Sequence, residues 1–144
     1  MKVYADSSFL VSLYLNDVHS EKANAWMRRH SEPLPFTPLH RHELRNAIRL
    51  AVWRKMLDDI ARRNAFRALD ADLKQHILVH QPVAWADAFR ETERIGGVVT
   101  GQTGIRAADL LHLGIAATLD AGEFLTFDAT QRKAAVALGL KCKP

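Results

Sequence analysis

The chain has 144 residues, a formal net charge of +4 and a sequence pI of about 9.5, with 48% hydrophobic and 25% charged residues. This composition is typical of a globular protein, and no apolar run approaches the roughly 20 residues that cross a bilayer, so a membrane protein is not expected. One cysteine, Cys142, excludes an intrachain disulfide and a cysteine-based zinc site. Because the N-terminus lacks the features of a signal peptide, we expect a cytoplasmic protein with a single domain over residues 1–144.

Short apolar segments rich in β-favouring residues alternate with segments of helical periodicity. In the first half we expect strands at Lys2–Ala5 and Leu34–Thr37, and helices at Ser7–Leu15, Ser20–Arg29, Leu39–Lys55 and from Asp58 or Asp59 to about Gln75. In the second half we expect strands at Ile77–Val79, Phe124–Phe127 and Leu140–Lys143, and helices at Trp85–Ile95, Ile105–Leu119 and Ala129–Leu138. Four glycines indicate a loop between two of these helices: Gly96, Gly97, Gly101 and Gly104. The alternation predicts an α/β fold, a three-layer α/β/α sandwich with a short, mostly parallel central sheet.

Two aspartates share one position in this pattern, at the end of a strand and directly before a helix. Asp6 follows the strand Lys2–Ala5, and Asp128 follows the strand Phe124–Phe127. In a parallel sheet both lie at the carboxyl edge, where α/β folds bind ligands. Capping of the next helix is the ordinary alternative, and it would explain both aspartates.

Two further acids lie inside helical segments. Asp109 has almost only apolar neighbours in the helix Ile105–Leu119, and a buried aspartate is rare unless it is paired or bound to a metal. Glu43 lies early in its own helix, where the helix dipole alone would favour an acid. Asp109 is therefore the stronger functional candidate of the two.

Four segments together resemble the PIN-domain ribonucleases, and most closely the VapC type of bacterial toxin. They are Val-Tyr-Ala-Asp-Ser-Ser-Phe-Leu around Asp6, His-Glu-Leu around Glu43, Ile-Arg-Ala-Ala-Asp-Leu-Leu-His-Leu around Asp109 and Leu-Thr-Phe-Asp ending at Asp128. The resemblance implies a PIN-like fold and a magnesium-dependent endoribonuclease, with manganese as a substitute, that is the toxin of a type II toxin–antitoxin pair. The implied partners are RNA, a cognate antitoxin protein and a second copy of the chain in a homodimer.

The implied chemistry suits these residue types. Magnesium prefers oxygen ligands, and a bound cation supplies an activated water and stabilises the leaving oxygen of a phosphodiester. Acids gathered at one point would also repel one another without a cation. We assign Asp6, Asp109 and Asp128 as catalytic residues that face the metal, and Glu43 as a catalytic residue that is a ligand or positions the attacking water.

Three other residues are expected to support these acids. Thr126 lies two residues before the last acid and so on the same face of the strand, where its hydroxyl would orient a carboxylate or a metal-bound water. Ser7 would do the same for Asp6, although capping or strand packing explains either hydroxyl equally well. Arg106 is one turn from Asp109 and is expected to contact an RNA phosphate, with pairing to an acid as the alternative.

The chain departs from the family pattern directly after the last acid. Many relatives carry a basic residue there, whereas this chain has Ala129-Thr130-Gln131. Gln131 and Arg132 could substitute for that residue in contacting RNA. The histidine of the third segment, His112, is expected to be a hydrogen-bonded core residue.

Arginines at four-residue spacing form a stripe on one helix. Arg41, Arg45 and Arg49 lie roughly opposite Glu43, since successive residues turn by about 100°. The stripe is a solvated face, a distal RNA contact or a partner surface. A basic chain favours encounter with a polyanion in general, without proving one here.

Two functions of other classes remain open. A non-catalytic PIN-like RNA-binding or scaffold module would keep the fold without the reaction, but all four acids are present in this chain. A phosphoryl-accepting α/β domain that uses Asp6 would need a second acid two residues later, where this chain has Ser8. We therefore expect the ribonuclease.

Overall fold

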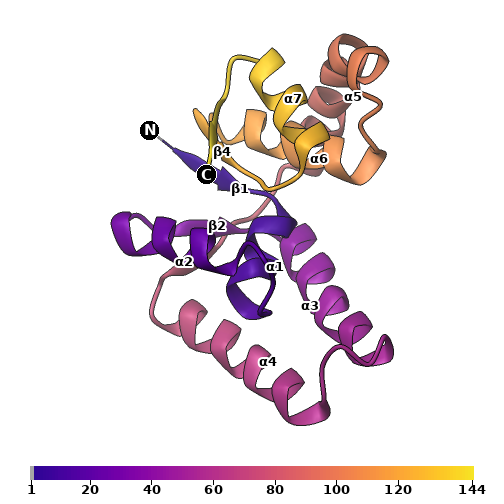
Figure 1. Cartoon of the computed structure of the whole chain (residues 1–144). Helices are drawn as coiled ribbons and strands as arrows, with labels where there is room; N and C mark the ends of the chain where they lie inside the picture. The colour runs from indigo at the N-terminus through magenta and orange to yellow at the C-terminus, as the bar shows by residue number, and fades with distance from the viewer. Residues whose placement is uncertain (1) are drawn as a thin grey trace. The chain divides into compact units, whose positions relative to one another are not determined.

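The computed structural model describes residues 2–144, and its internal contacts divide the chain into two compact units (Figure 1). The first unit combines the N-terminal residues up to Asp6 with Pro82–Pro144, and the second is Ser7–Gln81. Among residues 2–144, none of the helices combines the length and apolarity that a membrane crossing requires. The acids of the sequence pattern are thereby divided, with Asp6, Asp109 and Asp128 in the first unit and Glu43 in the second.

The first unit is built on a parallel sheet with the strand order β1-β4-β5. Its elements are β1 (Val3–Ala5), α5 (Trp85–Thr103), α6 (Ala107–Thr118), β4 (Glu123–Leu125), α7 (Ala129–Ala137) and β5 (Lys141–Lys143). The pairing continues one residue beyond the strands, because the Asp6 amide donates to the Leu125 carbonyl and the Thr126 amide donates to the Lys143 carbonyl, each at 2.9 Å. Asp6 and Thr126 therefore lie at the carboxyl edge of adjacent strands.

An aromatic pair and a histidine form the centre of this unit's core. Tyr4 and Phe124 are opposite each other in the β1–β4 register, are fully buried, and stack with ring centroids 5.8 Å apart. The Tyr4 hydroxyl hydrogen-bonds His112 Nδ1 at 2.7 Å. Because a buried polar group is costly without a partner, this bond explains how both side chains lie in the core. The expectation of a hydrogen-bonded core histidine at 112 is confirmed.

The loop expected at the glycines is wrong, because α5 runs through them without a break. Gly96, Gly97 and Gly101 are helical, and the helix ends only at Gly104, whose φ of +67° is a left-handed cap that favours glycine. The Gly104 amide donates to the Thr100 carbonyl at 2.8 Å.

Close packing of α5 against α6 explains part of this glycine content. A Cβ on Gly96 would lie 2.9 Å from Leu110 Cδ2, and one on Gly114 would lie 1.9 Å from Thr92 Oγ1. Small residues at these points let the two helices approach each other, as a tightly packed interior requires. Nothing in the packing explains Gly97, because a Cβ there would meet no atom within 4 Å apart from its chain neighbours and the backbone of its own helix.

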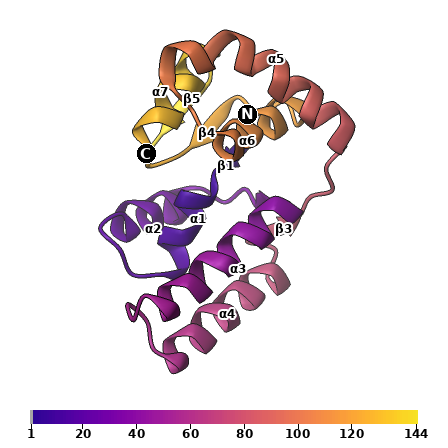
Figure 2. The same ribbon diagram turned by 90° about the vertical axis from the view of Figure 1, so that its right-hand side faces the viewer.

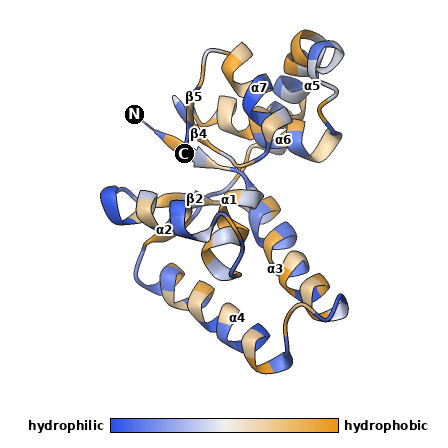
Figure 3. Ribbon diagram, viewed as in Figure 1, coloured by the Kyte–Doolittle hydropathy of each residue, from blue (hydrophilic) through white to orange (hydrophobic). Residues whose placement is uncertain are grey.

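The second unit consists of helices and a two-stranded parallel sheet, β2-β3. Its elements are α1 (Ser7–Tyr14), α2 (Ser20–Arg29), β2 (Leu34–Phe36), α3 (Pro38–Trp53), α4 (Asp59–Lys74) and β3 (Leu78–His80). Helices α3 and α4 form a hairpin in which hydrophobic and hydrophilic residues alternate along each helix (Figure 2, Figure 3). Their buried residues recur at helical spacing, as in Leu44, Ile48 and Ala51 of α3.

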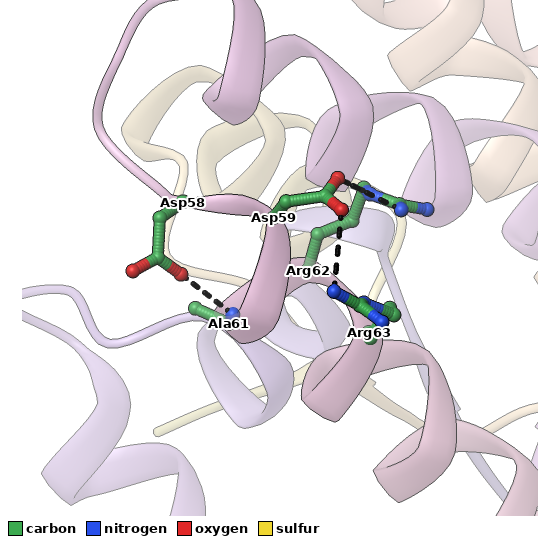
Figure 4. A network of polar contacts seen from close by, with 5 residues as sticks. All are labelled: Asp58, Asp59, Ala61, Arg62 and Arg63. Atoms are coloured by element: carbon green, nitrogen blue, oxygen red, sulfur yellow. Dashed lines mark hydrogen bonds and ion pairs between the residues drawn. The ribbon is translucent and has the colours of Figure 1, made fainter.

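Side-chain caps fix where α3 and α4 begin. Thr37 Oγ1 accepts from the His40 amide at 3.2 Å, and His40 Nδ1 accepts from the Thr37 amide at 3.0 Å, which is a reciprocal capping box. At α4, the Asp58 carboxylate accepts from the Ala61 amide at 2.7 Å (Figure 4). The helix Leu39–Lys55 and the start at Asp58 or Asp59 were thus predicted within two residues, the usual uncertainty of helix ends.

The α/β class and the parallel pairing of the strands are confirmed. The strands that the structure describes form two sheets, one in each unit, where the sequence predicted a single central sheet. The strand expected at Phe124–Phe127 is Glu123–Leu125, and the helix expected at Ile105–Leu119 is Ala107–Thr118. That residues 1–144 are a single domain stays a prediction.

Candidate active site

Asp6 is a buried acid at the carboxyl end of β1. Its side chain is 2% exposed, and Thr126 Oγ1 donates a hydrogen bond to Asp6 Oδ2 at 2.5 Å. Thr126 follows β4 and is itself fully buried. Because an ionised carboxylate is costly to bury, it requires donors or a cation, and the hydroxyl supplies one such donor.

The same hydroxyl is linked to Asp128. The Asp128 amide donates to Thr126 Oγ1 at 3.0 Å, and Asp128 Oδ1 accepts from the Gln131 amide at 2.7 Å. Asp128 is therefore the N-cap of α7, which was the ordinary alternative for this residue. Its side chain is nevertheless exposed, so capping and a functional role are compatible.

Gln131 connects this edge of the sheet to α6. It is 1% exposed, and its side-chain Nε2 donates to the Asp109 backbone carbonyl at 2.8 Å. Its Oε1 lies 3.4 Å from Thr126 Oγ1. Its burial in this network disfavours a contact between the Gln131 side chain and RNA, and that contact stays a prediction. The Arg132 guanidinium also contacts the backbone, because it donates hydrogen bonds to the carbonyls of Thr126 and Pro144, each at 2.9 Å.

The surroundings of Asp109 in the structure differ from those that the sequence predicted. Helix α6 begins at Ala107, so Asp109 is its third residue and lies in the first turn, where the helix dipole favours an acid. Its side chain is half-buried, whereas the apolar neighbours predicted full burial. Arg106 occupies the N-cap position of the same helix and is exposed, as an RNA contact would require.

Glu43 and Ser7 form a pair in the second unit. Ser7 Oγ donates to Glu43 Oε1 at 2.8 Å, so the first residue of α1 orients an acid on α3. Glu43 is half-buried. Ser7 follows Asp6 directly in the chain, and its expected support of Asp6 stays a prediction.

The donor chemistry of the first unit suits a hard cation better than a soft one. Asp6, Asp109 and Asp128 offer only carboxylate oxygens, which magnesium and manganese prefer. Burial raises the pKa of Cys142, which keeps this thiol protonated and a poor ligand. Within residues 2–144 no three acids, histidines or cysteines are close enough together to form a ready-made metal site. A cation would therefore bind with bridging waters or some side-chain adjustment, and magnesium usually retains waters.

The comparison with protein families identifies the chain. The family model of the PIN domain matches residues 3–137, and the chain belongs to this family. None of the curated protein sequences with which it was compared matches significantly.

Solved structures of low sequence identity share the fold. The VapC20 toxin of Mycobacterium tuberculosis, described as cleaving the sarcin–ricin loop, has a TM-score of 0.64 at 15% identity, over 92% of this chain and 95% of that one. FitAcB of Neisseria gonorrhoeae has a TM-score of 0.68 at 18% identity, over 99% and 96% of the two chains. VapBC2 of Rickettsia felis, bound to a DNA fragment from its promoter, has a TM-score of 0.70 at 15% identity, over 99% and 98%.

Proposed function

We propose that this PIN-domain protein is a magnesium-dependent endoribonuclease and the toxin of a type II toxin–antitoxin pair. Membership of the PIN family supports a nuclease. The fold shared with VapC20, FitAcB and VapBC2 supports a toxin that is held by a cognate antitoxin protein. In this proposal the protein acts on RNA in the cytoplasm and forms a homodimer.

The observation that carries the proposal is the network around Thr126. One hydroxyl donates to the buried carboxylate of Asp6 and accepts from the backbone amide of Asp128, and the Gln131 side chain extends the network to the backbone carbonyl of Asp109. Capping accounts for Asp128, but it does not account for a buried acid at a strand end. These contacts fix the backbone beside Asp109 and Asp128 relative to the buried carboxylate of Asp6, which supports the proposal that the three acids serve one site.

In the proposed reaction these residues have separate tasks. Asp6, Asp109 and Asp128 hold magnesium, or manganese in its place, directly or through water. The bound cation supplies an activated water and stabilises charge on the leaving oxygen. Glu43, oriented by Ser7, is a ligand or positions the attacking water, and Arg106 binds a phosphate of the RNA.

The first experiment replaces Asp109 by asparagine, which keeps the size of the side chain and removes its charge. We expect Asp109→Asn to abolish magnesium-dependent cleavage of RNA while the protein stays folded. Asp87→Asn is a matched control, because Asp87 is also the third residue of its helix and lies in the first turn of α5. Cleavage is followed on gels with magnesium and with EDTA, and folding by circular dichroism.

The outcomes separate the proposed function from its alternative. Cleavage by wild type and Asp87→Asn, but not by Asp109→Asn, is the expected result. Full cleavage by Asp109→Asn would remove this acid from the site. A wild-type protein that binds RNA but never cleaves it, at any magnesium or manganese concentration, would favour the non-catalytic RNA-binding module.

A further inference from the structure

The net positive charge of the chain is concentrated in one helical hairpin. Residues 38–74, which form α3 and α4 with their connection, contain nine Lys and Arg against five Asp and Glu. Their net charge of +4 equals that of the whole chain, because the remaining residues carry eleven of each sign. Such a local excess attracts a polyanion, whereas the same charge spread evenly would not mark any surface.

Arginines of both helices gather around one aromatic ring of this hairpin. The guanidinium carbons of Arg45, Arg49 and Arg62 lie 4.3, 5.2 and 5.8 Å from the centroid of the Phe66 ring. Burial, together with the positive charges of Arg41 and Arg49, lowers the pKa of Arg45, although Asp70 acts in the opposite direction. The cluster therefore contains like charges that a bound anion would stabilise.

The acids of the hairpin are mostly engaged elsewhere. Asp58 caps α4, and Asp59 pairs with Arg62 at 2.9 Å and with Arg63 at 3.5 Å (Figure 4). Asp72 accepts from the hydroxyl of Tyr14. Within the part of the chain that the structure describes, no ion pair involves the three arginines of the α3 stripe: Arg41, Arg45 and Arg49. Of the charge of these arginines, that of Arg45 is opposed by a nearby acid, Asp70, which forms no ion pair with it.

An exposed tryptophan continues the stripe. Trp53 follows Arg49 by four residues, as Arg49 follows Arg45 and Arg45 follows Arg41, and 79% of its surface is exposed. Neighbours at this spacing are about 6 Å apart along the helix axis. Arginine binds phosphate through a rigid fork of donors, and an exposed aromatic ring offers a stacking platform for an unpaired base.

From this arrangement we infer that the α3 stripe of Arg41, Arg45, Arg49 and Trp53 binds the backbone and a base of single-stranded RNA. The choice of RNA rests on the proposed function, whereas the surface itself rests on charge and exposure. The stripe lies roughly opposite Glu43 on α3, so it binds a phosphate other than the one that Glu43 serves. It is a second RNA contact, which adds affinity without taking part in the reaction.

The test measures binding without cleavage. Fluorescence anisotropy of a labelled single-stranded RNA is recorded in EDTA, so that the result does not depend on the proposed reaction. The stripe variant combines Arg41→Gln, Arg45→Gln and Arg49→Gln. The matched control combines Lys22→Gln, Arg28→Gln and Arg29→Gln, which remove the same charge from exposed positions of α2. A third variant, Trp53→Leu, removes the aromatic ring.

We expect the stripe variant to bind about tenfold or more weakly at low salt. Its slope of log affinity against log salt should fall by about 2, since each phosphate contact to a single strand contributes about 0.7. Trp53→Leu should weaken binding about tenfold with the slope unchanged, because stacking is not ionic. The α2 control should keep the wild-type slope. Circular dichroism checks that each variant folds. If the stripe variant does not fold without the arginines around Phe66, the single variant Arg41→Gln takes its place.

Three results would overturn the inference. The first is equal RNA binding by the stripe variant and the α2 control, which would reduce the effect to overall charge. The second is a wild-type protein that does not bind RNA in EDTA at all. The third is a stripe variant that loses binding to polyglutamate but still binds RNA as the wild type does. That result would indicate that the surface binds an acidic protein. In each of these cases the proposed function is checked separately, by cleavage in magnesium at saturating RNA. If the stripe variant still cleaves RNA there, the proposed function stands although the inference about the stripe fails.

Discussion

A single hydroxyl, that of Thr126, lies between two of the acids. It donates to Asp6 and accepts from the backbone of Asp128, so its orientation is fixed from both sides. The alternation of side chains along a strand was enough to predict that Thr126 faces the acids. Its partner could not be predicted, because the sequence does not give the register that pairs Ala5 with Leu125.

Gln131 shows what sequence reasoning missed at this scale. Its side chain donates to the carbonyl of Asp109, twenty-two residues away, and this contact depends on how α7 docks against α6. The polar side chain suggested a surface residue, whereas the structure buries it. An available signal was its position three residues after Asp128, where the backbone amide donates to the side chain of an N-cap residue.

We predict that Gln131→Glu destabilises the protein and weakens the site. A carboxylate cannot donate to the Asp109 carbonyl and would add negative charge beside Asp6, so we expect a loss of about 1–3 kcal/mol in the free energy of unfolding. Urea denaturation measures this loss, and RNA cleavage should fall with it. Gln102→Glu, at an exposed position of α5, is the control and should change neither. Equal stability of the two variants would show that the buried amide contributes nothing.

At the scale of the elements, α5 packs closely against α6, the helix that carries Asp109. The helices approach closely because Gly114 of α6 faces Thr92 and the Ala88 carbonyl of α5. The glycines of α5 predict a loop, since in a sequence a glycine that ends a helix looks the same as one that lets another helix approach. Of the four, only Gly104 adopts the left-handed conformation that the loop interpretation requires.

Replacement by alanine should have opposite effects on the free energy of unfolding at a packed glycine and at an open one. Gly114→Ala should lower the free energy of unfolding by about 1–3 kcal/mol, because the added methyl group forces α5 and α6 apart. Gly97→Ala should raise it by about 0.5–1 kcal/mol, because that position is open and alanine favours the helix. Urea denaturation of both variants checks the pair, and a stable Gly114→Ala protein would contradict the packing argument.

At the scale of the whole molecule, the sequence predicted the class of fold better than it predicted how the strands are divided between sheets. Alternating strand and helix patterns were sufficient for parallel pairing, because a strand–helix–strand unit has few other solutions. They did not predict that the strands form a three-stranded and a two-stranded sheet. Patterning specifies which residues are buried, whereas the choice of neighbouring strands depends on contacts distant in the chain.

The net charge of the molecule can be read from the sequence, but the distribution of that charge over the surface cannot. The sequence gives a net charge of +4, and the structure assigns the excess to the α3–α4 hairpin and shows Arg45 and Arg49 over the Phe66 ring. From the sequence alone, the stripe of Arg41, Arg45 and Arg49 is a solvated face, a distal RNA contact or a partner surface. Cation–π attraction alone can hold a solvated arginine over a ring, so the contacts with Phe66 are compatible with all three, and the local excess of positive charge is what favours the RNA contact.

The central claim, that the acids of the first unit bind a divalent cation, is tested most directly by calorimetric titration of magnesium into Asp128→Asn. The matched control is Asp58→Asn, because both aspartates are N-caps that accept an amide at 2.7 Å and asparagine caps a helix equally well. We predict that wild type and Asp58→Asn bind magnesium alike and that Asp128→Asn binds at least about tenfold more weakly. Indistinguishable titrations of the two variants, or no uptake of magnesium by the wild type, would contradict the account.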